Sequence, residues 1–542
     1  MTTLFDISNN LAREPILAMK MWPSIFNDVI GPVMRGPSSS HCAASLRIGR
    51  LCRDLINGRI DNILIEFDPN GSLATTHKSQ GSDMGLFGGL LGWEADDDRL
   101  PESESYLADA GISVAIEIVD IGATHPNTYK ITLSNATETR QLTAISTGGG
   151  MIEVIEIDGS VVSIAGDYFE TLVYSRSPDA VSEFLYDRIP NDYVYVHTGE
   201  PGFVEIKSRE FPSDEILADL LDRPDVLFIR ELQPVLPILS RRDDYVPFKT
   251  CDEMFEFNEG KDLTLWELAV EYESARGGIT KDEVFEKMRP IVRVMGDAIA
   301  TGLKGTEYTD RILGSQSLQL RQQLESRNLI GGDANNTIIM YVSATMEVKS
   351  SMGVIVAAPT AGSCGALPGA VFGVAQSLNL SEDDIVKAML AAGIIGVFIA
   401  SRATFAAEVG GCMAETGSGG GMAAAAVVMM AGGSLHQSVG AASLALQNSL
   451  GLICDPIGNR VEAPCLGRNV MAASNAVASA NMALSNYAHL IPLDEVIDTM
   501  KEVGDRIHNT LRCTNLGGLS ITNTAKKIGE SLNDRQRFFK IC

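Results

Sequence analysis

A long stretch without formal charge is the strongest constraint on how this chain folds. Residues 416–454 contain no Asp, Glu, Lys or Arg, although charged residues make up 21% of the 542-residue chain and its net charge is −26. In so acidic a protein, a run of this length must lie mostly inside. Because it is rich in Ala, Gly and Ser, we expect helices that pack closely against one another.

The length predicts more than one domain, since a single core stops growing at about 250–300 residues. We expect an α+β domain over residues 1–225, a linker over 226–262 and a mostly α-helical catalytic domain over 263–542. Asp158 and Gly159 are typical of a hairpin turn between two strands. The strands expected in the first half cover residues 61–67, 112–121, 129–134, 140–146, 151–158 and 160–166.

Charge and apolar content exclude several classes of protein. The excess of acidic residues disfavours binding to nucleic acid or to an anionic membrane. The longest apolar runs, 389–400 and 422–433, are shorter than the roughly 20 residues that cross a bilayer, so we expect buried helices and no membrane span. No secretory signal is visible and the nine Cys are scattered, which indicates a cytoplasmic protein without disulfides.

Cysteines in contexts punctuated by Gly and Pro are the first candidates for chemistry. Three thiolates meeting in one place would suit an iron–sulfur cluster, but the chain has no Cys-x-x-Cys pair, and small buried Cys also simply fill space. The candidates are Cys364, Cys412, Cys454 and Cys465, whereas Cys42, Cys52, Cys251 and Cys513 read as structural. The terminal Cys542 either reaches into a cavity or belongs to an exposed tail.

Residues 36–41, with the sequence GPSSSH, form a second candidate site. The hydroxyls of Ser38, Ser39 and Ser40 and the nearby backbone N–H groups could hold a carboxylate, and His41 could move a proton near neutral pH. The alternative is a helix N-terminal cap with a surface histidine.

A third candidate is the glycine-rich segment 417–421. Such a turn before an apolar helix can hold a phosphate, as in some pyridoxal-phosphate enzymes, and Lys349 is the nearest upstream lysine for a Schiff base. The alternative is close backbone packing at these glycines.

Taken together, these segments resemble the iron–sulfur-dependent L-serine dehydratases (L-serine ammonia-lyases), in a form that fuses a small and a large domain in one chain. The resemblance extends over nearly the whole chain and is weakest over residues 160–340. It rests on motifs in the same order at residues 36–41, 81–92, 343–369, 408–417, 450–469 and 516–522.

The resemblance implies the chemistry of each site residue. Cys412, Cys454 and Cys465 would bind a [4Fe–4S] cluster and leave one iron open for the substrate hydroxyl. His41 would remove the α-proton, and aminoacrylate would then yield pyruvate and ammonia. The remaining assignments are the substrate-binding residues Ser38, Ser39, Ser40, Thr360 and Arg468, the tail ligand Cys542, and a regulatory region over 110–205 with motifs at 125–128 and 148–150.

Three departures from the family pattern bear on the substrate. Cys42 follows the histidine where Thr is usual, and residues 79–81 read Ser-Gln-Gly where Gly-His-Gly is usual, which makes His77 a candidate substitute for the missing histidine. The third departure is at residues 457–460. We therefore keep open the same elimination on another β-substituted acid, such as L-cysteine or L-threonine.

Two further classes of function stay open. One is a pyridoxal-phosphate lyase that uses segment 417–421, and the other is an amino-acid sensor without turnover. In the enzyme reading, His41 and the cysteines lie in different halves of the chain, so they must meet at a domain interface. A small-molecule amino acid is then the expected partner, and a homodimer is plausible.

Overall fold

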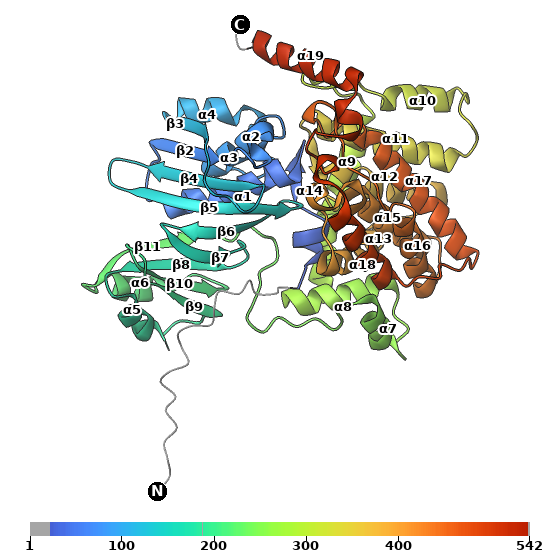
Figure 1. Ribbon diagram of the computed structural model, residues 1–542. Coiled ribbons are helices and arrows are strands. Elements are labelled where there is room, and N and C mark those ends of the chain that lie inside the picture. Colours follow the sequence, from blue (N-terminus) through green and yellow to red (C-terminus); the bar gives the residue numbers. More distant parts are fainter. Residues whose placement is uncertain (1–21, 187, 540–542) are drawn as a thin grey trace.

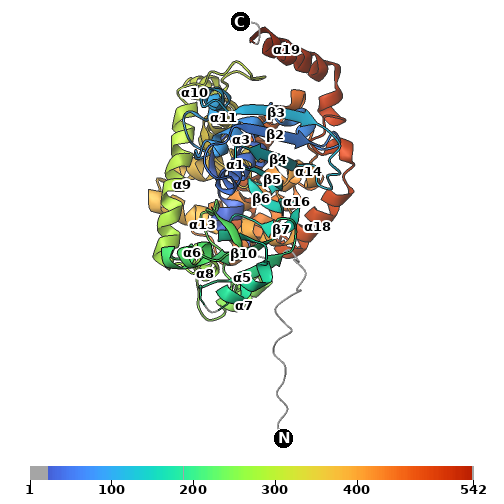
Figure 2. The same cartoon turned by 90° about the vertical axis from the view of Figure 1, so that its left-hand side faces the viewer.

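The computed structural model describes residues 22–186 and 188–539. Its strands lie in the N-terminal half except for the short β12, and the part that follows residue 250 is almost entirely helical (Figure 1). The expected combination of an α+β half with a helical half is thereby confirmed. After a turn of 90° about the vertical axis, the sheets lie in front of the helical body (Figure 2).

The first sheet has six strands in the order β3-β2-β4-β5-β6-β7, and only the β2–β3 pair is parallel. Asp158 and Gly159 have φ values of +48° and +80°, as the tight turn between β6 and β7 requires. Helices α1 (Ala44–Leu55) and α3 (Ser82–Leu90) share one hydrophobic core with this sheet. The strands are β2 (Asn62–Phe67), β3 (Ser113–Ile118), β4 (Thr128–Ser134), β5 (Thr139–Gly148), β6 (Met151–Ile157) and β7 (Ser160–Ile164).

The second sheet has four strands in the order β11-β8-β10-β9, and its core is shared with helices α5 (Pro178–Leu185) and α6 (Asp214–Leu221). Strand β11 lies inside the stretch 226–262 that the sequence predicted as a linker. It is an edge strand and only half-buried, so its composition resembles that of a loop. The strands are β8 (Phe169–Ser175), β9 (Tyr193–His197), β10 (Phe203–Ser208) and β11 (Val226–Leu232).

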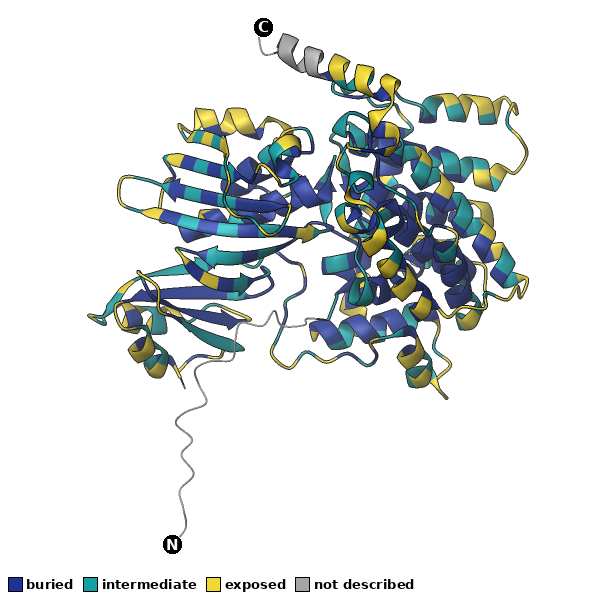
Figure 3. Ribbon diagram, in the orientation of Figure 1, coloured by how far each residue is buried: buried dark blue, intermediate teal, exposed yellow. Residues whose placement is uncertain are grey.

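The uncharged stretch forms helices α15 and α16 at the centre of the helical half (Figure 3). A Cβ atom on Gly421 would lie 2.9 Å from the side chain of Leu446, so these helices pack at glycine distance. The turn between them is largely exposed, and so is His436 in the first turn of α16.

The helices of this half are α7 (Cys251–Asn258), α8 (Leu265–Gly277), α9 (Lys281–Gly302), α10 (Ser317–Glu325), α11 (Asp333–Ser350), α12 (Ala366–Leu378), α13 (Glu382–Arg402), α14 (Ala407–Gly410), α15 (Ser418–Met430), α16 (Leu435–Gln447), α17 (Cys465–Leu484), α18 (Leu493–Arg506) and α19 (Asn523–Phe539). Of the described helices, α13 alone has the length and hydropathy of a membrane span, and 78% of that segment is buried inside the protein.

The first described segment of the chain belongs to the core of the helical half. A helical turn at Ile25–Val29 packs on α13, where a Cβ atom on Gly396 would lie 2.1 Å from Val29. Strand β1 (Val33–Arg35) pairs antiparallel with β12 (Val354–Val356). This two-stranded ribbon carries the chain from the helical half to residues 36–41.

Candidate active site

The segment Ser38 to His41 is buried where the two halves meet. His41 is 1% exposed, and its ring nitrogens contact two hydroxyls: Nδ1 lies 3.1 Å from Ser38 Oγ and Nε2 lies 3.0 Å from Thr76 Oγ1. Burial, and secondarily the neighbouring His77, lowers the pKa of His41 to about 4. The imidazole is therefore neutral at physiological pH, and the alternative of a surface histidine is excluded.

Helix α2 (Leu73–Thr76) connects His41 to the motif at residues 125–128. Thr76 Oγ1 donates to the Ser72 carbonyl at 2.6 Å, and the Ser72 hydroxyl donates to the Asn127 side chain. His77, considered as a substitute for the missing family histidine, instead contacts Asp83, with Nδ1 2.7 Å from Oδ1.

The loop that follows β12 brings Thr360 to the serine segment. Ser39 Oγ accepts a hydrogen bond from the Ala361 backbone N–H at 3.2 Å. Asn469, on α17, holds the same loop: its side-chain amide donates to the Gly362 carbonyl at 2.8 Å and its oxygen accepts from the Ala366 backbone N–H at 3.0 Å. The loop thus joins the N-terminal motif to the helix that begins at Cys465.

Glu415 is a site residue that the sequence analysis missed. It is half-buried three residues after Cys412, and its Oε1 accepts a hydrogen bond from Thr360 Oγ1 at 2.8 Å. Burial, and then the proximity of Cys412, raises the pKa of Glu415 to about 8. A Cβ atom on Gly362 would lie 2.8 Å from both carboxyl oxygens, so a glycine is needed there. The sequence feature that could have pointed to Glu415 is its position directly before the uncharged stretch 416–454.

The candidate cluster ligands gather next to Glu415. Cys412 and Cys454 lie in one buried group, and Cys465 begins α17 within electrostatic range of Cys412. A hydrogen bond from Cys454 lowers the pKa of Cys412, and the Arg468 guanidinium adds to this effect. Burial raises the pKa of Cys465.

Arg468 faces the thiols and is held by an acid. Its Nη1 donates to Cys412 Sγ at 3.3 Å, and its Nη2 pairs with Asp455. Asp455 also accepts from the backbone N–H of Leu519 at 2.7 Å, which ties the motif at residues 516–522 to the site.

Cys513, which the sequence analysis took as structural, lies beside the candidate ligand Cys454. Its Sγ lies 3.2 Å from Cys454 Sγ, and its backbone N–H donates to the Cys454 carbonyl at 2.9 Å. An isolated parallel β-bridge between the backbones of Cys454 and Arg512 aligns the two segments. No spacing rule pointed to Cys513, because its approach depends on how the chain after α18 folds back. Cys42, Cys52, Cys251 and Cys364 are buried, and Cys542 lies outside the described residues.

The glycine-rich segment 417–421 is packed rather than open. Cβ atoms on Gly417 and Gly421 would lie 2.5 Å from Ser449 Oγ and 2.9 Å from Leu446, which supports the packing alternative. Lys349 is fully buried, and its Nζ donates to the Val461 carbonyl.

The thiol group has the chemistry of an iron–sulfur site. Within residues 22–186 and 188–539, no three His, Cys, Asp or Glu side chains are arranged around one metal-ion position. The ligands of a cluster instead bind separate irons, and several buried thiols beside an Arg are a suitable set of soft, anionic ligands. The residues present therefore fit such a group.

A buried imidazole, hydroxyls and thiols at the junction of two halves are features of an enzyme site. The family model of the serine dehydratase alpha chain matches residues 260–520. The probable L-serine dehydratase alpha chain of Bacillus subtilis is 37% identical over 285 residues, which cover 53% of this chain and 95% of that protein. The probable beta chain of the same organism is 41% identical over 217 residues, or 39% of this chain and 97% of that protein.

The alpha chain from Peptoniphilus asaccharolyticus is 36% identical over 280 residues, covering 52% of this chain and 96% of that protein. The chain belongs to the serine dehydratase family. It unites in one polypeptide regions that Bacillus subtilis carries as separate alpha and beta chains.

Proposed function

We propose that this protein is an L-serine ammonia-lyase, which converts L-serine to pyruvate and ammonia by β-elimination of water. The proposal is supported by relatives named L-serine dehydratase and by one observation in particular. The segment that carries His41 is hydrogen-bonded through Ser39 to the backbone of Ala361. The adjacent Thr360 donates to Glu415, which lies three residues after Cys412. These links support a site in which His41 acts as the proton acceptor and the thiols bind the metal group.

The chain's own residues have separate roles in this proposal. Ser38, Ser39 and Ser40, with the nearby backbone N–H groups, hold the substrate carboxylate. His41, neutral at physiological pH because its pKa is about 4, accepts the α-proton once the substrate displaces one of its two hydroxyl contacts. Glu415, whose pKa is about 8, is protonated at neutral pH and can give a proton to the departing hydroxyl, while Thr360 positions its carboxyl.

Cys412, Cys454 and Cys465 would hold the [4Fe–4S] cluster, which supplies a Lewis acid that weakens the bond between Cβ and the hydroxyl oxygen. Arg468 balances the negative charge of Cys412 and is in turn fixed by Asp455. After elimination, aminoacrylate tautomerises to the imine, and water releases pyruvate and ammonia.

The first experiment measures iron and acid-labile sulfide in protein purified without oxygen, together with pyruvate formed from L-serine. We expect about four irons per chain and loss of iron in air. Cys412→Ser, Cys454→Ser and Cys465→Ser should each lose iron, whereas Cys52→Ser, in the separate core of the first sheet, should retain it. Iron-free active protein, or a full cluster in all three variants, would contradict the proposal.

Further assays on the same protein test the alternative substrates and cofactors. A panel with L-cysteine and L-threonine tests the related eliminations. Borohydride trapping of Lys349 would indicate a pyridoxal-phosphate enzyme, and binding of L-serine without turnover would indicate a sensor.

A further inference from the structure

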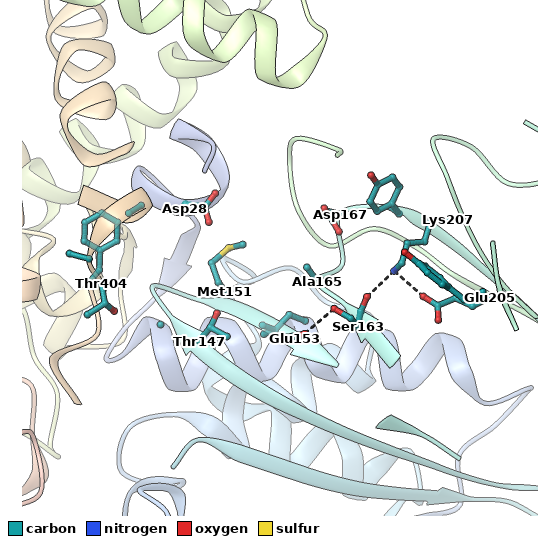
Figure 4. A pocket seen from close by; sticks show the side chains of 17 residues that line it. Asp28, Thr147, Met151, Glu153, Ser163, Ala165, Asp167, Glu205, Lys207 and Thr404 are labelled. Atoms are coloured by element: carbon teal, nitrogen blue, oxygen red, sulfur yellow. Dashed lines mark hydrogen bonds and ion pairs between the residues drawn. The ribbon is translucent and has the colours of Figure 1, made fainter. Parts of the chain in front are cut away.

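A second cavity lies away from the residues of the candidate active site. It has a volume of about 320 Å³ and is enclosed by β6 and β7 of the first sheet, β10 of the second sheet and the segment after α13 (Figure 4). Three parts of the fold thus contribute to its walls. His41, Thr360 and the thiols are not among its lining residues.

The cavity is strongly acidic. Asp28, Glu153, Asp167 and Glu205 line it, and Lys207 is the cationic residue of its lining. The Lys207 ammonium is already occupied, because Nζ lies 2.6 Å from Glu170 Oε1, 2.9 Å from Glu205 Oε1 and 2.9 Å from the Ser163 carbonyl. Because Nζ is hydrogen-bonded to Glu170 and to the Ser163 carbonyl and paired with Glu205, Lys207 does not offer a site for an anion.

Three buried polar atoms in this lining have no hydrogen-bond partner among the described residues, and one of them, Glu205 Oε1, lies 2.9 Å from the Lys207 ammonium. Asp167 and Tyr168 are each 2% exposed, and among the described residues neither Asp167 Oδ2 nor the Tyr168 hydroxyl has a hydrogen-bond partner. A buried carboxylate oxygen left unpaired is costly, so it points to a donor that the protein itself does not supply. Figure 4 shows Asp167 across the cavity from Asp28. Burial raises the pKa of Asp28, and Asp167 adds to the rise, as expected for two acids facing one unfilled space.

The other walls are apolar and aromatic. Met151 and Phe405 line the cavity together with Tyr168 and Tyr195, and aromatic faces attract cations. The volume is at the lower end of the range of about 300–1,000 Å³ typical of small-molecule pockets. An inorganic cation would leave most of this space and its apolar surface unfilled.

We propose that the cavity binds a small organic ammonium compound, with the cationic head between Asp28 and Asp167 and the apolar body against Met151 and Phe405. The proposal does not depend on the proposed catalytic function. The cavity wall nevertheless contacts the segment that leads to Cys412, since a Cβ atom on the lining residue Gly148 would lie 3.2 Å from Ala406.

The test is isothermal titration calorimetry of the full chain with n-butylammonium chloride, and with potassium chloride and butan-1-ol at matched concentration. We expect saturable binding of n-butylammonium alone. Asp167→Asn removes the charge with little change of shape and should weaken binding at least tenfold. The matched control Asp222→Asn changes an exposed residue at the end of α6 and should bind like the parent protein.

A second variant, at a different position in the cavity wall, tests the proposal even if Asp167→Asn fails to fold. Ala165→Phe fills the cavity from the end of β7 and should abolish binding. Absence of n-butylammonium binding to the parent protein, or unchanged affinity in Asp167→Asn and Ala165→Phe, would overturn the proposal. Equal binding of potassium ions would indicate an inorganic cation site, and equal binding of butan-1-ol would show that charge is not recognised; either result overturns it as well.

Discussion

At the scale of single residues, the close contact between Gly362 and Glu415 leaves no room for a Cβ atom at position 362. An added Cβ atom would displace the Glu415 carboxyl. Glu415 receives the Thr360 hydroxyl and lies three residues from Cys412. It can occupy this position because residue 362 has no side chain. The loop and the acid are thus matched in shape as well as in hydrogen bonding.

Gly362→Ala is therefore expected to displace the Glu415 carboxyl and reduce kcat for L-serine about 10- to 100-fold, the range for a lost proton-transfer or positioning contact. Gly467→Ala is the control. Gly467 lies in α17 between Cys465 and Arg468, where an added Cβ meets nothing within 4 Å. Steady-state kinetics of both variants decide the matter, and equal activity would mean that Glu415 is not needed where it lies.

The buried His41 makes stability dependent on pH. Its pKa is about 4 in the folded protein, against 6.5 for an unperturbed histidine side chain. The unfolded chain therefore binds a proton first as the pH falls, so His41 favours the folded state fully above pH 6.5 and progressively less towards pH 4. At pH 5 the loss is about 2 kcal/mol.

Urea unfolding of the cluster-free protein at pH 8 and pH 5 measures this loss. His41→Gln lacks the titration, and its unfolding midpoint should fall less between the two pH values than that of the parent. The same fall in both proteins would show that other groups account for the acid sensitivity.

At the scale of elements, helix α17 organises the site. It begins with Cys465, presents Arg468 to Cys412 and holds the Thr360 loop through Asn469, which is fully buried. The Asn469 side chain satisfies backbone groups of two other segments, a task that an apolar residue of the same size could not perform.

Asn469→Ala should leave these backbone groups unpaired and destabilise the protein by about 1–3 kcal/mol. It should also lower the retained iron, since the loop and the helix bearing Cys465 lose their connection. Asn481→Ala, on an exposed position of the same helix, is the control for helix propensity. Thermal unfolding and iron content are the readouts, and parental values for Asn469→Ala would refute this role.

Some helices and strands can be predicted from their own sequence and others cannot. Alternating strands such as 151–158 and 160–166, the Asp158–Gly159 turn and the uncharged helices carry local signals that survive folding. Strand β11 does not, because an edge strand resembles a loop. Likewise, the sequence brought Thr360 and Cys412 to notice by motif, but Glu415 and Cys513 join the site only through contacts between distant segments, which no local pattern encodes.

At the scale of the whole molecule, the halves are held together by more than the chain that links them. The turn at Ile25–Val29 packs on α13, and β1 pairs with β12. The relatives with separate alpha and beta chains show that this family exists without a covalent link between its two parts.

Cutting the chain at the exposed residues Arg242 and Asp243 should therefore leave the fragments associated and active. A protease site inserted there, followed by cleavage and gel filtration, tests this expectation. Co-elution of both fragments with retained activity is the expected result. Their separation without denaturant would mean that the connection through residues 233–250 is needed for assembly.

The ribbon formed by β1 and β12 also has a consequence for synthesis on the ribosome. Residues 25–35 emerge first, but their partners on α13 and β12 follow more than 300 residues later. At roughly 5–20 residues per second, the apolar Ile25, Phe26 and Val29 wait on the order of 20–70 s for their binding surface. The nascent chain therefore carries an uncovered apolar segment through most of its translation, which is the kind of segment that chaperones bind.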